Sequence, residues 1–189
     1  MQTILRRACR DTVRHPLPPG SHTLIEIVPY STEWPARFAQ EAALLRIALA
    51  PWLVADIEHI GSTAIPGLSA KPVIDIMAPV QDLDASRTAI AAAVAAGYCH
   101  YPYKPEQMHW FCKPSPEVRT HHLHLVPLNS ALWHDRLAFR DALRGNSQLA
   151  RDYENLKLSL AARHPEDREA YTEAKSPFIA SVLQAQRAG

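Results

Sequence analysis

The sequence predicts an α+β fold, a mixed β-sheet with helices packed on one side and a helical C-terminal third. Two observations support this class. Through the first two thirds of the chain, short stretches rich in β-branched and aromatic residues are separated by Pro, Gly and Ser, as strands are. From Leu132 onward, apolar residues recur every three or four positions, as they do along one face of a helix.

Each expected element has a local signal. Pro35 suits the first turn of a helix that ends before Pro51. Asp82 suits the N-cap of an alanine-rich helix that Gly97 closes. In the C-terminal third, residues 145–147 (Gly-Asn-Ser) separate two helices, and Pro177 is expected to kink the last one. Strands are expected at residues 23–30, 54–60, 73–80, 98–103, 109–114 and 120–128.

Length and composition indicate one globular domain. The chain has 189 residues, of which 47% are hydrophobic and 21% charged, and no linker or internal repeat divides it. We expect a single domain over residues 23–189. Residues 1–22 are arginine-rich and end in a Pro/Gly cluster, so we expect a flexible N-terminal extension, with a transit peptide or an upstream start site as alternatives.

Charge and cysteine content restrict the partners. A formal net charge of +1 argues against nucleic acid and against an acidic membrane surface. No apolar run approaches the roughly 18–20 residues of a membrane-spanning helix. Three cysteines without a CxxC spacing fit a reducing compartment. We therefore expect a cytoplasmic protein that binds a small molecule, and the sequence leaves its oligomeric state open.

A carboxylate stands inside an apolar strand in residues 57–76, IEHIGSTAIPGLSAKPVIDI. Ionised carboxylates are depleted in strands and costly to bury, so Asp75 requires an explanation. Because side chains alternate along a strand, Ile74 and Ile76 belong on the core face and Asp75 projects from the other. Upstream, Gly61 and Ser62 can let a backbone approach a phosphate and bind its oxygens, although most Gly-Ser pairs are simple turns.

Two histidines share one face of a later strand. In THHLHLV (120–126), His122 and His124 lie on one face, and Leu123 and Leu125 on the other. Imidazoles at this spacing can converge on one metal or phosphate, or they can form a solvated polar face. If this strand neighbours that of Asp75, the three side chains form one candidate site.

Basic residues near these motifs have two interpretations. Lys71 precedes the Asp75 strand and can neutralise a phosphate or be a solvated loop lysine. Arg136, Arg140 and Arg144 lie four residues apart and form a stripe that is typical of a solvated helix face. Lys157 and Lys175 are single helical lysines without a signal of their own.

Five segments together resemble the GrpB family, over about residues 24–180: IEIVPYSTEWPARF, IEHIGSTAIPGLSAKPVIDI, THHLHLV, LAFRDALR and YTEAKSPFI. This family also occurs fused behind dephospho-CoA kinase. It is placed in the nucleotidyltransferase superfamily typified by DNA polymerase beta. The resemblance implies that Gly61 and Ser62 hold a triphosphate and that Asp75 is the first of the carboxylates that bind divalent metal.

The chain departs from that superfamily at two positions. Met77 stands where a second carboxylate is usual, and a thioether does not hold magnesium. His122 or His124 stands where the third carboxylate is expected, which shifts the metal preference from magnesium towards manganese, zinc or iron. Glu58, on the preceding strand, is an alternative source of a carboxylate.

Two functional hypotheses follow. The first is a metal-dependent nucleotidyl or phosphoryl transferase that acts on a small molecule. The second is a non-catalytic nucleotide- or metabolite-binding accessory module with a degenerate nucleotidyltransferase site. In the first, Asp75, His122 and His124 bind one Mg, Mn or Zn ion, with Asp75 catalytic, and the phosphate is held by Gly61, Ser62, Lys71, Arg140 and Lys175.

Overall fold

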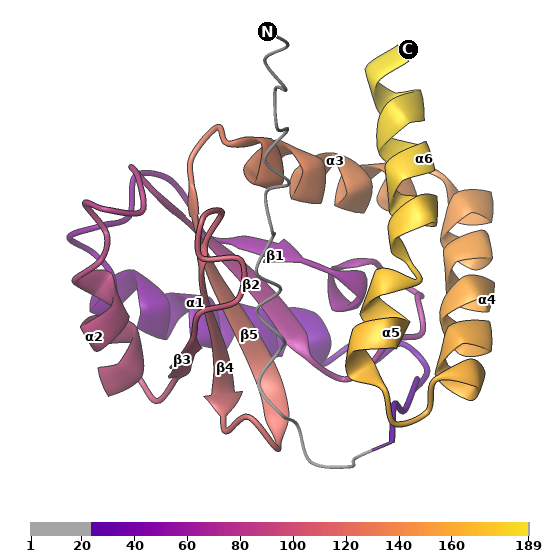
Figure 1. Ribbon diagram of the computed structural model, residues 1–189, viewed down its shortest axis with the longest axis horizontal. Helices are drawn as coiled ribbons and strands as arrows, with labels where there is room; N and C mark the ends of the chain where they lie inside the picture. The colour runs from indigo at the N-terminus through magenta and orange to yellow at the C-terminus, as the bar shows by residue number, and fades with distance from the viewer. Residues whose placement is uncertain (1–23, 189) are drawn as a thin grey trace, which may run out of the picture.

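A five-stranded mixed sheet organises the structure, a computed structural model that describes residues 24–188 (Figure 1). The predicted N-terminal extension lies outside the described residues. The strands follow the spatial order β1-β2-β5-β4-β3. Their bounds are β1 (Glu58–Ile60), β2 (Ile74–Val80), β3 (Cys99–Tyr101), β4 (His109–Pro114) and β5 (Arg119–Pro127).

The central strands β2 and β5 run parallel, and the other pairs are antiparallel. The chain passes from β2 to β5 through one helix and the β3–β4 pair. The helices are α1 (Trp34–Ala48), α2 (Ala89–Ala95), α3 (Ala131–Gly145), α4 (Ser147–Arg163), α5 (Arg168–Glu173) and α6 (Ser176–Ala188), with a single 3₁₀ turn, η1 (Ser62–Ala64).

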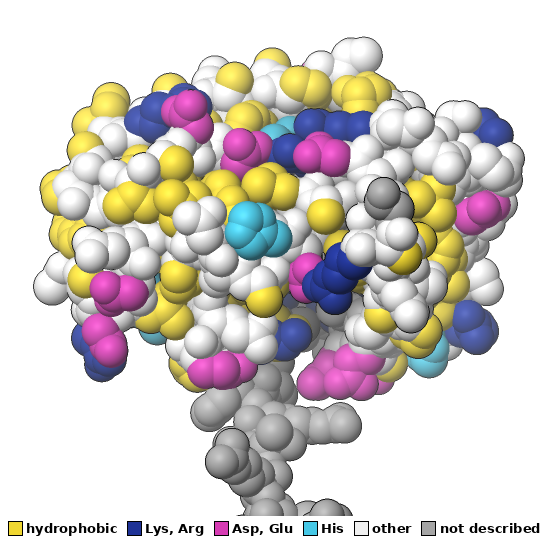
Figure 2. Space-filling model, turned by 90° about the horizontal axis from the view of Figure 1, so that it is seen from above, with side chains coloured by type: hydrophobic (Ala, Val, Ile, Leu, Met, Phe, Trp, Pro, Cys, Tyr) yellow, Lys and Arg dark blue, Asp and Glu magenta, His cyan; other side chains and the backbone are white. Residues whose placement is uncertain are grey.

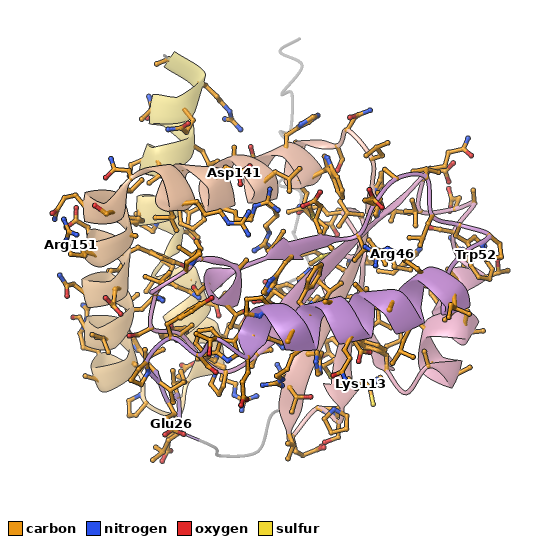
Figure 3. The ribbon with its side chains drawn as sticks, turned by 180° about the vertical axis from the view of Figure 1, so that it is seen from behind. Glu26, Arg46, Trp52, Lys113, Asp141 and Arg151 are labelled. Atoms are coloured by element: carbon orange, nitrogen blue, oxygen red, sulfur yellow. The ribbon has the colours of Figure 1, made fainter. Side chains whose placement is uncertain are left out.

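One face of the sheet is covered by α1 and α2, and Figure 3 shows α1 lying across it. The buried side chains of this layer include Ile74 and Ile76 from β2 and Leu123 and Leu125 from β5, all 0% exposed. Leu45 of α1 packs against them. The alternation predicted for both strands is therefore correct, and it turns Asp75, His122 and His124 towards the opposite face.

The opposite face is flanked by the C-terminal helices. Helix α3 contacts β1, β5, α4 and α6, and Figure 1 shows α4, α5 and α6 grouped beside the sheet. A second apolar cluster under α3 contains Met77, Trp110, Val126 and Trp133. The predicted α+β class, with its mixed sheet and helical C-terminal third, is confirmed. The prediction that helices pack on one side of the sheet holds for α1 and α2, whereas the C-terminal helices lie at the other face.

Side-chain caps explain where the C-terminal helices begin. The Ser130 hydroxyl accepts a hydrogen bond from the Trp133 amide at the start of α3, and the Asn146 side chain accepts one from Leu149 at the start of α4. Asp167 caps α5 in the same way. Pro177 lies in the first turn of α6, so the chain breaks between α5 and α6 where a kink was predicted.

Four predicted elements differ in length or kind, one of them the strand predicted at 98–103, of which only β3 forms. Within residues 23–30, a single bridge between Val28 and Ala70 forms instead of a strand, and the Ile25 amide bonds the Pro165 carbonyl. The strand predicted at 54–60 contains only β1. Asp82 caps a turn, by accepting from the Ala85 amide at 2.6 Å, and the helix begins later, at Ala89.

The surface seen in Figure 2 shows basic and acidic side chains interleaved, without a continuous basic patch on that face. Among residues 24–188, no helix combines the length and the apolar character needed to cross a bilayer.

Candidate metal centre and adjoining cavity

The register of β2 and β5 brings the three predicted ligands together. Asp75 is paired with His122, and Met77 with His124. The Asp75 Oδ1 atom lies 2.9 Å from His122 Nδ1 and 3.8 Å from His124 Nε2. One potential ligand atom from each residue lies within 4.8 Å of the other two. The predicted convergence of these side chains on neighbouring strands is thus present in the structure.

Two imidazole nitrogens in this cluster have no hydrogen-bond partner among the described residues. They are His122 Nε2 and His124 Nε2, both buried. Buried polar atoms without a partner are uncommon, so each requires an explanation. The other nitrogen of His124 lies 3.2 Å from the Met108 sulfur, which is only a weak acceptor. His124 Nε2 is therefore open to a metal ion.

The protonation states also fit metal binding. Burial pushes the pKa of Asp75 upward, but the hydrogen bond with His122 and the nearby imidazole of His124 outweigh burial and hold it well below its usual range. Burial lowers the pKa of His124 to about 4. At neutral pH the carboxylate is ionised and His124 is neutral, as metal ligands must be. Two nitrogens and one carboxylate suit manganese, zinc or iron better than magnesium.

The position at which the sequence resemblance implies a second carboxylate is closed to solvent. Met77 is 0% exposed and packs with Trp110 and Val126 in the apolar cluster under α3. The described cluster therefore offers a single carboxylate, and it resembles a one-metal rather than a two-metal arrangement.

Gly61 passes directly over the Asp75 carboxylate. Its φ is 71°, and a Cβ placed on it would lie 2.3 Å from Asp75 Oδ2. Only glycine fits there, because any other side chain would collide with the carboxylate and occupy a left-handed backbone region. The Ser62 hydroxyl, next in the chain, is hydrogen-bonded to the Tyr153 hydroxyl of α4. The Gly-Ser turn and Asp75 therefore form one contiguous site.

Arginines of α3 brace this turn from behind. Arg144 donates two hydrogen bonds to the Ala64 carbonyl, at 3.0 and 2.8 Å. Arg140 donates to Glu58 at 2.6 Å and to the His59 carbonyl at 3.1 Å, and it also pairs with Asp141. Glu58, the alternative metal carboxylate, is thus bound to Arg140. These bonds make two arginines of the stripe, Arg140 and Arg144, structural supports for the turn.

A cavity of about 210 Å³ opens beside the cluster. Among the described residues that line it, Asp75 is the only carboxylate and six are basic. From the predicted set, Ser62, Lys71, Asp75, His122, His124 and Lys175 line it, whereas Gly61 and Arg140 do not. The basic residues are Lys71, Arg119, Arg136, Lys157, Arg168 and Lys175.

Three lysines stand close to aromatic rings in this cavity. The Lys71 and Lys175 ammonium groups lie 5.1 and 4.4 Å from the centre of the Tyr171 ring. Lys157 lies 5.2 Å from the Tyr153 ring, and it donates to the Ser69 carbonyl. Burial lowers the pKa of Lys71 and Lys157 to about 7 and that of Lys175 to about 8.

Several lining residues carried no usable signal in the sequence. Lys157, Arg168 and Tyr171 lie 80 or more positions from Asp75 and reach it only through the packing of α4 and α5. Arg136 belonged to the stripe but appeared no different from its neighbours Arg140 and Arg144. Only tertiary packing, and no local sequence pattern, distinguishes Arg136, which lines the cavity, from Arg140 and Arg144, which do not.

Comparison with known proteins identifies the family. A sequence model of the family described as "GrpB protein" matches residues 24–185. The chain belongs to the GrpB family. A UPF0157 protein of Pseudomonas aeruginosa is 45% identical to it over 84% of this chain, which spans 66% of that protein. The glutamate-rich protein GrpB of Alkalihalophilus pseudofirmus is 34% identical, over 83% of this chain and 92% of that one.

A solved structure supports the fold. The crystal structure of conserved protein GrpB from Enterococcus faecalis matches with a TM-score of 0.76 and 30% identity, over 85% of this chain and 96% of that chain. A dephospho-CoA kinase of Mycolicibacterium paratuberculosis is 27% identical over 82% of this chain but only 44% of its own length. That pattern agrees with the predicted occurrence of a GrpB family domain fused to this kinase.

Replacing Gly61 by alanine should destabilise the fold more than the same change at Gly67. Both glycines have a positive φ, 71° and 79°, so both variants share a backbone cost of about 1–2 kcal/mol. Only the Gly61→Ala variant adds a collision with Asp75, worth roughly 1–3 kcal/mol, because nothing lies within 4 Å of a Cβ at Gly67. Urea unfolding measures both. Equal losses would contradict the close approach.

His59 should make stability depend on pH. Its Nε2 lies 3.1 Å from the Thr63 hydroxyl, its ring stacks on Phe38, and burial lowers its pKa from 6.5 to about 4. As the pH falls, the unfolded state therefore binds a proton at this histidine before the folded state does. The stability that neutral His59 contributes is complete above about pH 6.5 and is lost as the pH falls towards 4. The loss is on the order of 3 kcal/mol.

The His59→Gln variant isolates this contribution. Urea unfolding of both proteins from about pH 7 to about pH 4 should show a shallower decline for the variant, because glutamine does not titrate. Identical declines would mean that His59 is not the responsible group.

Proposed function

We propose that this protein is a metal-dependent nucleotidyl- or phosphoryl-transfer protein that acts on a small molecule. The observation that carries the proposal is the position of the Asp75, His122 and His124 cluster, which lies on the wall of a cavity whose described lining includes six basic residues. A cation site beside a basic anion site is the arrangement that stabilises the charge of a transferring phosphoryl group.

The metal would be held by Asp75, His122 and His124. Three protein ligands leave a coordination position for a water molecule or a substrate oxygen, as in catalytic metal sites. When bound, the ion would supply Lewis-acid polarisation of a phosphoryl oxygen. The nitrogen-rich ligand set favours manganese, zinc or iron over magnesium.

The phosphate would be held at the Gly-Ser turn and by nearby lysines. The Ser62 hydroxyl, the backbone beside Gly61, and Lys71 and Lys175 all adjoin Asp75 or line the same cavity. We leave Arg140 out of this set, because its guanidinium is bound to Glu58, Asp141 and the His59 carbonyl. Its role here is to hold β1 and the turn in place.

A non-catalytic accessory module is the second candidate. The buried Met77 favours it, because the usual second carboxylate is missing and metal chemistry would depend on a single ion. Both candidates include a small phosphorylated ligand and a cytoplasmic location. The free thiols of Cys99 and Cys112, which face each other across β3 and β4, agree with a reducing compartment.

Metal binding tests the proposal. Isothermal titration with manganese or zinc should show one site per chain, and Asp75→Asn and His124→Gln should each weaken it by at least about tenfold. His134→Gln is the matched control, because His134 is exposed on α3 and outside the cavity. Wild-type affinity in the Asp75 and His124 variants would contradict the assignment.

Turnover separates the two candidates. The metal-loaded protein is incubated with ATP, GTP or CTP, and triphosphate consumption is followed in wild type and Asp75→Asn. Consumption that requires Asp75 supports the enzyme. Binding of nucleotide and metal without any consumption supports the accessory module.

A further inference from the structure

The three cavity lysines come from three separate elements and meet at one place. Lys71 precedes β2, Lys157 lies in α4, and Lys175 lies between α5 and α6. Lys71 and Lys175 approach the same ring, that of Tyr171. Lys157 is only 2% exposed. Such convergence of like charges is unfavourable unless an anion completes it.

No carboxylate among residues 24–188 forms a close ion pair with these lysines, although Asp75 acts on Lys71 and Lys175, and Glu154 on Lys157, at longer range. The ion pairs in the described part of the chain join other residues, and none of them involves Lys71, Lys157 or Lys175. Repulsion by Lys175 is the second cause, after burial, of the lowered pKa of both Lys71 and Lys157. Aromatic rings and one backbone carbonyl hold the ammonium groups in place without neutralising them.

Basic side chains already lie over the aromatic rings of Tyr103, Trp110 and Tyr171, which line the cavity. Tyr171 is covered by Lys71 and Lys175, Trp110 by Arg119 at 5.6 Å, and Tyr103 by Lys104 at 5.5 Å. His122 also lies 5.1 Å from the Trp110 ring. A nucleobase that stacked in this cavity would have to displace one of these groups.

The cavity is also small. Its volume of about 210 Å³ lies below the roughly 300–1,000 Å³ of sites that enclose drug-sized ligands. The enclosed part of a ligand is therefore compact, and the three converging lysines call for more than one negative charge on it.

We propose that Lys71, Lys157 and Lys175 form an anion subsite for a compact, multiply phosphorylated small molecule, and that this cavity does not recognise a nucleoside. The inference rests on the proposed function, since it specifies the ligand of the same site. It restricts the chemistry to phosphoryl groups carried by a small polyphosphorylated compound.

The test compares five probes by isothermal titration against the metal-free full chain, so that chelation does not contribute. They are orthophosphate, pyrophosphate, tripolyphosphate, ATP and citrate. Tripolyphosphate should bind at least as tightly as ATP, and at least about tenfold more tightly than orthophosphate or citrate. Lys175→Gln and Lys157→Met should each weaken tripolyphosphate binding about tenfold or more.

Two controls separate ligand binding from structure. Arg151→Gln removes a charge from the outer side of α4 (labelled in Figure 3) and should leave tripolyphosphate binding unchanged. In the absence of ligand, Lys175→Gln should unfold at the same or a higher urea concentration than wild type, because it removes an uncompensated charge. A lower midpoint would assign Lys175 a structural role and contradict the subsite.

The remaining outcomes distinguish the two proposals. ATP binding about tenfold more tightly than tripolyphosphate would show that a nucleoside is recognised, which overturns the inference and leaves the proposed function standing. Citrate binding as tightly as tripolyphosphate would overturn the phosphate assignment. Failure of the proposed function would instead appear as absent metal binding in the wild-type protein, with the anion affinities unaffected.

Discussion

The parallel pairing of β2 with β5 is the constraint on which the site depends. It sets Asp75 opposite His122 and Met77 opposite His124, and a one-residue shift of β5 would turn both histidines into the layer under α1, away from Asp75. The apolar alternates Ile74, Ile76, Leu123 and Leu125 fix that register, because they fill the opposite face completely. Burial on one face therefore determines ligand geometry on the other.

A second feature of the site is its charge imbalance. One carboxylate faces six basic lining residues, and three of those are lysines whose pKa values burial lowers to about 7 or 8. The C-terminal helices deliver most of these groups, and capping residues such as Ser130, Asn146 and Asp167 set where those helices begin. The cavity thus requires the helical third to be docked on the sheet. Stability and ligand binding oppose one another there, because the mutual repulsion of the three lysines disfavours the empty cavity and attracts an anion.

The sequence was most informative where the alternation of side chains along a strand decides which face of the sheet a residue occupies. Alternation placed Asp75, His122 and His124 on one face, and resemblance to the GrpB family placed the Gly61-Ser62 turn beside them. Local rules failed where two interactions compete: Asp82 caps a turn instead of the helix, and Arg140 binds Glu58 instead of facing the cavity. Lys157 and Tyr171 could not be predicted at all, because only the packing of α4 and α5 brings them to Asp75. The closeness of Gly61 to Asp75 likewise exists only in three dimensions.

The central claim is that Asp75, His122 and His124 bind one metal ion, and anomalous diffraction tests it most directly. In crystals grown with manganese or zinc, the account predicts a single strong anomalous peak in contact with Asp75 and both histidines, at about 2.0–2.2 Å for zinc. The direct hydrogen bond between Asp75 Oδ1 and His122 Nδ1, now 2.9 Å, should then be replaced by bonds to the ion. The account is contradicted if no peak appears at this cluster while that hydrogen bond remains intact at saturating metal.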